Sequence, residues 1–299
     1  MVKRIGTDWG LNVRMVITLF LLACVYLLFM GALYYFGVNF GLIVVVALAL
    51  AVAQYYWSDK LILLSLGAQE VTEQQAPQLH DMVSRLAAMT GLPKPKVALI
   101  DSPVPNAMAT GRNPDHSLVA VTTGILGMLT PEEMEAVLAH EMSHVIHRDM
   151  RVMAMASFFA TVASFIVQSG MWGGMYGGYG RRDNRDNGSS FMLIFLVSIV
   201  VWAISFVLIR TLSRYREYSA DRGSAIITGQ PSQLASALVK ISGRMQRIPD
   251  QDLRQVEAGN TLMIFPAISR GSISEIFSTH PSLEHRLAKL QEMEAALAH

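Results

Sequence analysis

Cysteine and charge are both scarce in this chain of 299 residues. Cys24 is the only cysteine, which excludes an intramolecular disulfide and a zinc site built from several cysteines. Charged residues make up 16% of the sequence and hydrophobic residues 52%. An ordinary soluble domain carries roughly 25% charged residues, so the deficit indicates a membrane protein. The net charge of +1 gives no support for binding to nucleic acid.

The longest stretch without charge lies near the N-terminus. No Asp, Glu, Lys, Arg or His occurs from Met15 to Ser58. This run is too long for one membrane crossing, which needs about 20 residues. The segment GVNFG is a natural break, so we predict two spans, 15–36 and 38–57. A cleaved signal peptide is the alternative, but its apolar region would be shorter.

A second apolar hairpin is predicted further along the chain. Its arms are residues 152–172 and 191–209, joined by a Gly-rich polar connection. A buried core helix is the alternative for the first arm, which contains polar side chains. Four spans place both chain ends and the segment between the hairpins on one side of the membrane. Lys and Arg flank the spans there, so the positive-inside rule predicts that this side is cytoplasmic, although Arg181, Arg182 and Arg185 in the connection argue for the opposite.

Two polar segments remain, 58–151 and 210–299. Each is small for a stable core, and together they make up about one domain. We thus expect one domain in two halves, interrupted by the hairpin 152–209 and preceded by the hairpin 1–57. The predicted fold class is α+β, mostly helical with a small sheet. The expected elements are a helix that ends at Gly91 and Pro93, strands at 96–101 and 117–126, a turn at 106–115, and a C-terminal helix.

The segment VLAHEMSHVIHRD carries the chemistry. The TPEE sequence just upstream is typical of a helix that starts with a capping box. His140, Glu141 and His144 form the pattern H-E-x-x-H. Residues four apart on a helix differ by about 40° in direction and about 6 Å in height, so the two imidazoles can bind one metal ion. The pattern predicts one Zn2+ per chain, with Glu141 as the base that takes a proton from a zinc-bound water during peptide hydrolysis.

A third metal ligand must come from another part of the chain. His147 lies on the same helical face but about 10 Å along the axis from His140, out of reach of an ion held by His140 and His144. Glu217 and Asp221 follow the last span and lie four residues apart on a predicted helix. One of them can ligate the ion while the other orients a ligand histidine. An ion network with the nearby arginines is the alternative.

Several separated motifs together resemble one protein family. The segment HEMSHVIHRDM, the hydrophobic hairpin after it, and EYSAD resemble the HtpX family of membrane-bound zinc metalloproteases, which are relatives of the CAAX prenyl proteases. PNAMATGRNPDHSLVAVTTGIL and HPSLEHR extend the resemblance over essentially the whole chain. The resemblance implies a zincin-like catalytic domain and about four transmembrane helices.

The resemblance also implies a role for each site residue. These roles are zinc ligation by His140, His144 and Glu217, general base catalysis by Glu141, support of Glu217 by Asp221, oxyanion stabilisation by His280, and binding of the substrate backbone by Asn106. It further implies a multi-pass protein of the bacterial inner membrane whose catalytic domain faces the cytoplasm. Such a protein degrades misfolded or damaged membrane proteins without nucleotide, and the sequence contains no G-x-x-x-x-G-K-[ST] motif.

We also expect an edge strand to bind the substrate. The strand near 117–123 comes just before the metal-binding helix, so an extended substrate would pair there with the backbone of Val119 and Val121. Two other function classes stay open. A membrane scaffold with a structural zinc would have no need of Glu141, and a peptidase for prenylated C-termini would belong to relatives that usually have more than four spans.

Overall fold

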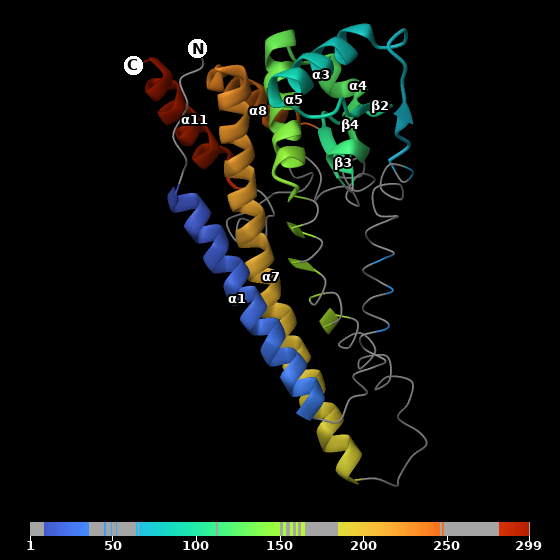
Figure 1. Ribbon diagram of the computed structural model, residues 1–299, viewed down its shortest axis with the longest axis vertical. Helices are drawn as coiled ribbons and strands as arrows, with labels where there is room; N and C mark the ends of the chain where they lie inside the picture. Colours follow the sequence, from blue (N-terminus) through green and yellow to red (C-terminus); the bar gives the residue numbers. More distant parts are fainter. Residues whose placement is uncertain are drawn as a thin grey trace. The chain divides into compact units, whose positions relative to one another are not determined.

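A computed structural model gives the fold of the chain (Figure 1). The described residues are 9–35, 45, 49, 52, 64, 66–111, 113–149, 152, 153, 156, 157, 160, 163, 164, 185–245, 247 and 281–298. Contacts divide the chain into two compact units. The first unit combines residues 1–11, 56–151 and 213–299, and the second combines residues 12–55 and 152–212.

Two helices are long and apolar enough to cross a membrane, judged by length and composition among the described residues. They are α1 (Trp9–Tyr35) and the part of α7 (Arg185–Thr228) from Met192 onward. Large apolar side chains such as Leu27 and Leu28 are about three-quarters exposed on α1, as lipid-facing residues would be. Helix α1 contains the predicted span 15–36 except for its last residue. The part of α7 from Met192 onward contains the predicted span 191–209 except for its first residue. The predicted spans 38–57 and 152–172 lie mostly outside the described residues.

The second unit is held together by apolar side chains along these helices. Leu22 and Tyr26 of α1 pack in one cluster with Ala156 and Leu212. The Tyr26 hydroxyl donates a hydrogen bond to the Ala156 carbonyl. A second cluster lies further along the helices, so the contact continues from one turn of α1 to the next.

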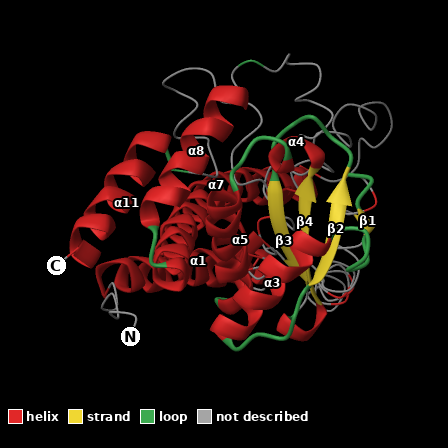
Figure 2. Cartoon of the chain, turned by 90° about the horizontal axis from the view of Figure 1, so that it is seen from above, coloured by secondary structure: helices red, strands yellow, loops and turns green. Residues whose placement is uncertain are grey.

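The first unit contains a four-stranded mixed sheet (Figure 2). Its strands are β1 (Gln69–Glu70), β2 (Lys96–Ile100), β3 (Ala107–Gly111) and β4 (Ser117–Thr122). Their order is β1-β2-β4-β3, with β2 and β4 parallel and the two outer pairs antiparallel. Side chains alternate between the two faces because the strand period is two residues.

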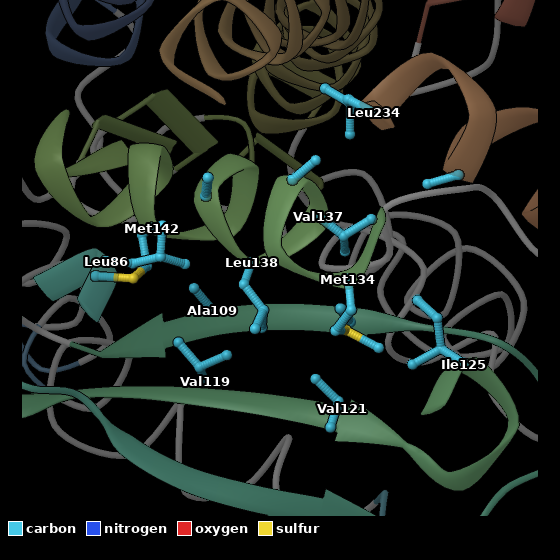
Figure 3. Packing of buried hydrophobic residues seen from close by; sticks show 14 of the residues in the cluster. Leu86, Ala109, Val119, Val121, Ile125, Met134, Val137, Leu138, Met142 and Leu234 are labelled. Atoms are coloured by element: carbon cyan, nitrogen blue, oxygen red, sulfur yellow. The ribbon is translucent and has the colours of Figure 1, made fainter. Parts of the chain in front are cut away.

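Helices α3 (Pro77–Thr90) and α5 (Pro131–Ile146) cover one face of this sheet. Figure 3 shows Leu138 and Met134 of α5 above Val119 and Val121 of β4. On the other side of α5 lies α8 (Pro231–Met245), which also packs against α11 (Leu283–Ala298). The metal-binding pattern is therefore carried by a helix that is buried between the sheet and α8.

Local chemistry explains how α5 begins and how α3 ends. The Thr130 hydroxyl accepts the Glu133 N–H while the Glu133 carboxylate accepts the Thr130 N–H, which confirms the predicted capping box. Helix α3 ends at Gly91, whose φ of 70° is the left-handed conformation that glycine adopts without strain. The predicted C-terminal helix is also confirmed as α11.

Two predictions for the first unit were wrong. The predicted turn at 106–115 contains the strand β3, because its small apolar residues pair along β4. Strand β4 ends at Thr122 and is followed by the short helix α4 (Thr123–Leu126), so the predicted strand 117–126 is too long. The predicted span 191–209 and the predicted helix that carries Glu217 and Asp221 are both helical and form one continuous helix, α7, since no Gly or Pro separates them.

The predicted substrate edge was wrong as well. Strand β4 pairs with β2 on one side and with β3 on the other, and Val119 and Val121 are fully buried. The backbone groups of β4 are therefore used within the sheet. The outer strand next to α5 is β3.

Candidate metal centre

Two helices bring three potential metal ligands together. His140 and His144 lie about one turn apart on α5, and Glu217 comes from α7. The two imidazole Nε2 atoms are 3.3 Å apart, and each lies 3.6 Å from an oxygen of Glu217. In a tetrahedral site with bonds of about 2.0–2.1 Å, two ligand atoms are about 3.4 Å apart. The three side chains therefore fit a single small cation.

Small residues allow α7 to approach α5 closely at this point. A Cβ atom added to Gly223 would lie 2.2 Å from Ser143 Oγ and 2.7 Å from Ser143 Cβ, so only glycine fits without a displacement. The Ser224 hydroxyl donates to the Ala136 carbonyl of α5 at 2.7 Å. This close crossing holds Glu217, on the preceding turns of α7, beside the two histidines.

The Nδ1 atom of His140 faces a buried acid–arginine pair. Asp221 Oδ1 lies 3.0 Å from this nitrogen. The guanidinium of Arg286, on α11, donates to both oxygens of Asp221, with Nε–Oδ2 and Nη2–Oδ1 distances of 2.9 and 2.6 Å. Arg286 also lies 3.7 Å from a Glu217 oxygen. Of the two acids four residues apart on α7, Glu217 thus faces the Nε2 atoms and Asp221 faces Nδ1.

The Nδ1 atom of His144 faces a second carboxylate, that of Asp149. The distance to Asp149 Oδ2 is 2.6 Å, and Arg216 Nε lies 3.1 Å from the same oxygen. The sequence pattern gave Asp149 no role and gave Arg216 only the alternative of an ion network. The available signal was the acid five residues after His144, just beyond the end of the metal-binding helix.

Glu141 points from α5 to the outer strand of the sheet. It is buried, and its Oε2 atom accepts the backbone N–H of Ala109, on β3, at 3.0 Å. Burial raises the pKa of the Glu141 carboxyl to about 8, and the nearby Glu217 charge acts in the same direction. A carboxylate in this environment takes up a proton readily, as a general base must.

The ligand histidines have opposite pKa shifts. Burial lowers the pKa of His140, but the carboxylates of Asp221 and Glu217 outweigh this effect and raise it to about 9. For His144, burial dominates and lowers the pKa despite the contact with Asp149. Burial also raises the pKa of Asp149, but the neighbouring His144 and Arg216 outweigh it, and the net pKa lies below its usual range. The site thus combines a protonated imidazole at His140 with a neutral one at His144 and a stabilised carboxylate at Asp149.

The other predicted site residues lie in different places. Asn106 is buried just before β3, where its N–H donates to Thr122 Oγ1 and its carbonyl accepts the Thr122 N–H, both at 2.9 Å. His147 caps the end of α5 and is exposed, and it is not part of the metal-ligand group of the described residues. His280 lies outside the described residues.

A buried H-E-x-x-H helix, a glutamate from a second helix and an adjacent strand define a class of protein. In that class, two histidines and a glutamate hold a metal ion while the glutamate within the pattern acts as base. The class is that of the metallopeptidases.

Comparison with known proteins identifies the family. The model of peptidase family M48 matches residues 73–294, and the chain belongs to this family. It is 58% identical to the Protease HtpX homolog of Moorella thermoacetica, over 98% of this chain and 97% of that protein. It is 55% identical to Protease HtpX homolog 2 of Methanosarcina mazei, over 97% of this chain and 98% of that protein. The predicted relationship to the HtpX membrane metalloproteases is confirmed.

A solved structure shares the fold. The crystal structure of S. mikatae Ste24p matches with a TM-score of 0.56 at 18% identity, over 94% of this chain and 66% of that chain. The fold of this chain is therefore one already found in a crystal structure.

Proposed function

We propose that this protein is a zinc-dependent endopeptidase that cleaves misfolded or damaged membrane proteins without nucleotide. The observation that carries the proposal is the fit of two imidazole Nε2 atoms, 3.3 Å apart, with the Glu217 carboxylate, which places a different oxygen 3.6 Å from each of them. Glu141 lies on the same helix as the two histidines. His140 Nε2, His144 Nε2 and the Glu217 carboxylate would hold the ion. Zinc bound there would supply a Lewis acid that lowers the pKa of a water molecule and polarises a peptide carbonyl.

Glu141 would act as the general base of the reaction. Its carboxylate would take the proton of the attacking water and transfer it to the leaving amine. The hydrogen bond from the Ala109 N–H to its Oε2 atom fixes one carboxylate oxygen against β3 and leaves the other oxygen to hold the proton. The roles of His280 in stabilising the oxyanion and of Asn106 in binding the substrate backbone are part of the same proposal.

The outer strand β3 is the proposed site for the substrate backbone. In the order β1-β2-β4-β3, β3 has one strand neighbour among the described residues. The Ala109 N–H faces the Glu141 side chain rather than β4, so the outer edge of β3 runs directly past the proposed base. An extended peptide that pairs with this edge through its backbone would be held next to the metal ligands. Because main-chain pairing ignores most side chains, it suits substrates of varied sequence.

The location of the protein in a membrane would determine which substrates can reach this site. The membrane helices α1 and α7 and the similarity to HtpX proteases support a multi-pass protein of the bacterial inner membrane. The Lys and Arg residues that flank the predicted spans support a catalytic domain on the cytoplasmic side. Unfolded, extended segments of damaged membrane proteins would reach the site from that side.

The test compares the purified protein with its Glu141→Gln variant. Each is incubated with an unfolded membrane protein, with and without added zinc and without nucleotide. We expect the wild type to cleave only when zinc is bound, and the variant to bind zinc with little change while its cleavage rate falls by a factor of at least about 100. Cleavage that persists in the variant would show that another group is the base. Zinc binding without any cleavage by the wild type would favour a structural zinc.

A further inference from the structure

The turn at the end of α5 has an unusual backbone conformation. His147 is the C-cap of the helix, and Arg148 follows with a φ of 56°. Among the described residues, Arg148 is the only one other than glycine with a positive φ. A side chain with a Cβ is strained in this left-handed conformation, and such strain persists where surrounding contacts hold it. The Arg148 side chain is exposed, so the contacts that hold the turn come from its neighbours.

This turn places Asp149 next to the metal ligand His144. Its side chain is buried although it comes directly after the exposed residues 146–148. The chain reverses so that Asp149 Oδ2 lies 2.6 Å from His144 Nδ1, the nitrogen on the opposite side of the ring from the metal-facing Nε2. A distance of 2.6 Å is that of a short, charge-assisted hydrogen bond.

Arg216 holds the same carboxylate from α7. Its Nε atom lies 3.1 Å from Asp149 Oδ2, and both side chains are nearly inaccessible to solvent. Arg216 directly precedes Glu217 on α7. One segment of α7 therefore supplies both the third ligand and Arg216. Through Asp149, Arg216 is connected to the Nδ1 side of the His144 ring. One oxygen of the buried Asp149 carboxylate is thus in contact with both the histidine and the arginine.

We propose that Asp149, held by Arg216, is a positioning residue for the metal ligand His144. The carboxylate accepts the Nδ1–H of the imidazole, which fixes the tautomer that has its lone pair on Nε2 and turns that atom toward Glu217. The pair thus does for His144 what Asp221 and Arg286 do for His140. The inference rests on the proposed function of the site as a metal centre but not on proteolysis.

The test measures metal affinity rather than activity. All variants carry Glu141→Gln so that self-cleavage is removed, and Zn2+ affinity is determined by competition with a chromophoric chelator. We expect Asp149→Ala to weaken zinc binding by a factor of about 10 to 100, the usual effect of removing the partner of a ligand histidine. Asp149→Asn keeps the shape but not the charge and should give a smaller loss. Arg216→Gln should weaken binding, whereas Arg216→Lys should restore part of it.

Two controls separate positioning from general stability. Arg148→Gly relaxes the strained turn without touching the carboxylate, so it should bind zinc as tightly as the parent. Co2+ placed in the site reports ligand geometry directly, and its visible spectrum should change in the Asp149 variants but not in Arg148→Gly. If Asp149→Ala fails to fold, Asp149→Asn carries the test. Unchanged zinc affinity and an unchanged Co2+ spectrum in a folded Asp149 variant would overturn the proposal, whether or not the parent protein cleaves any substrate.

Discussion

The protonation and metal binding of single residues in the site depend on charged groups that are buried in contact with one another. His140 is completely buried between the carboxylates of Asp221 and Glu217. These carboxylates stabilise a proton on the imidazole in the same place where they would stabilise a metal ion. A proton and a metal ion therefore compete for His140, and the competition must depend on pH.

We predict that zinc binding expels about one proton from the protein near pH 7. Because the pKa of His140 is raised to about 9, the imidazole is protonated at neutral pH and must lose its proton before Nε2 can bind a metal ion. Zinc affinity should thus fall by up to about tenfold for each pH unit below about 9. Calorimetry in buffers of different ionisation enthalpy measures the protons released.

The control for this prediction is Asp221→Asn. It removes one of the two charges that raise the pKa of His140, so it should reduce the number of protons released. Zinc binding with no proton release and with an affinity independent of pH would contradict the prediction. His144 is expected to contribute little, since burial keeps its pKa low.

Among the secondary-structure elements, β3 connects the fold to the chemistry. Backbone groups in and just before β3 alternate between two edges. The Asn106 carbonyl accepts the Thr122 N–H on the β4 side, whereas the Ala109 N–H donates to Glu141 on the other side. The outer edge therefore presents a backbone group at every second residue. A substrate strand paired with this edge would use only every second one of its own amides.

We predict that single N-methylation of a peptide substrate blocks cleavage with a period of two residues. Methylation of an amide that faces β3 removes a hydrogen-bond donor and adds a clash, so kcat/KM should fall by a factor of about 10 or more, the equivalent of one lost hydrogen bond. Methylation of the neighbouring amide, which faces away, should have a much smaller effect and serves as the matched control. Mass spectrometry of the products measures both. Equal loss at consecutive positions would contradict pairing along β3.

At the scale of the whole molecule, the site depends on segments that are far apart in the chain. Helix α5, helix α7 and the C-terminal helix α11 each contribute to it, and α11 does so through Arg286, which is 1% exposed. The positive charge of Arg286 is buried against Asp221 and close to Glu217. Packing of the C-terminal helix and integrity of the metal site should therefore be lost together.

We predict that Arg286→Met destabilises the protein by about 3–5 kcal/mol, because it leaves the buried charge of Asp221 without its partner. The double variant Asp221→Asn with Arg286→Met should be less destabilised than Arg286→Met alone, since the uncompensated charge is then removed as well. Thermal unfolding in detergent, in the presence of a chelator, measures each step. Equal stability of the single and double variants would show that the pair does not act through its charge.

Features that depend on residues close together in the chain could be predicted from the sequence. The pattern His140, Glu141 and His144 acquires its geometry from one helix, and the capping box of Thr130 and Glu133 sets where that helix begins. Long apolar runs identified the two candidate membrane helices in the same way, because the thickness of a bilayer sets a length that can be counted along the chain.

Contacts between residues far apart in the chain depend on how the helices and strands pack, and the sequence pattern did not predict them. Glu217 and Asp221 were both candidates for the third ligand, and the close crossing of α5 and α7 at Gly223 settled their positions. Strand β3 was predicted as a turn and β4 as an edge, because strand pairing is set by burial of distant segments and not by local composition. The role of Asp149 was not predicted for the same reason, since it depends on a turn and on an arginine from another helix.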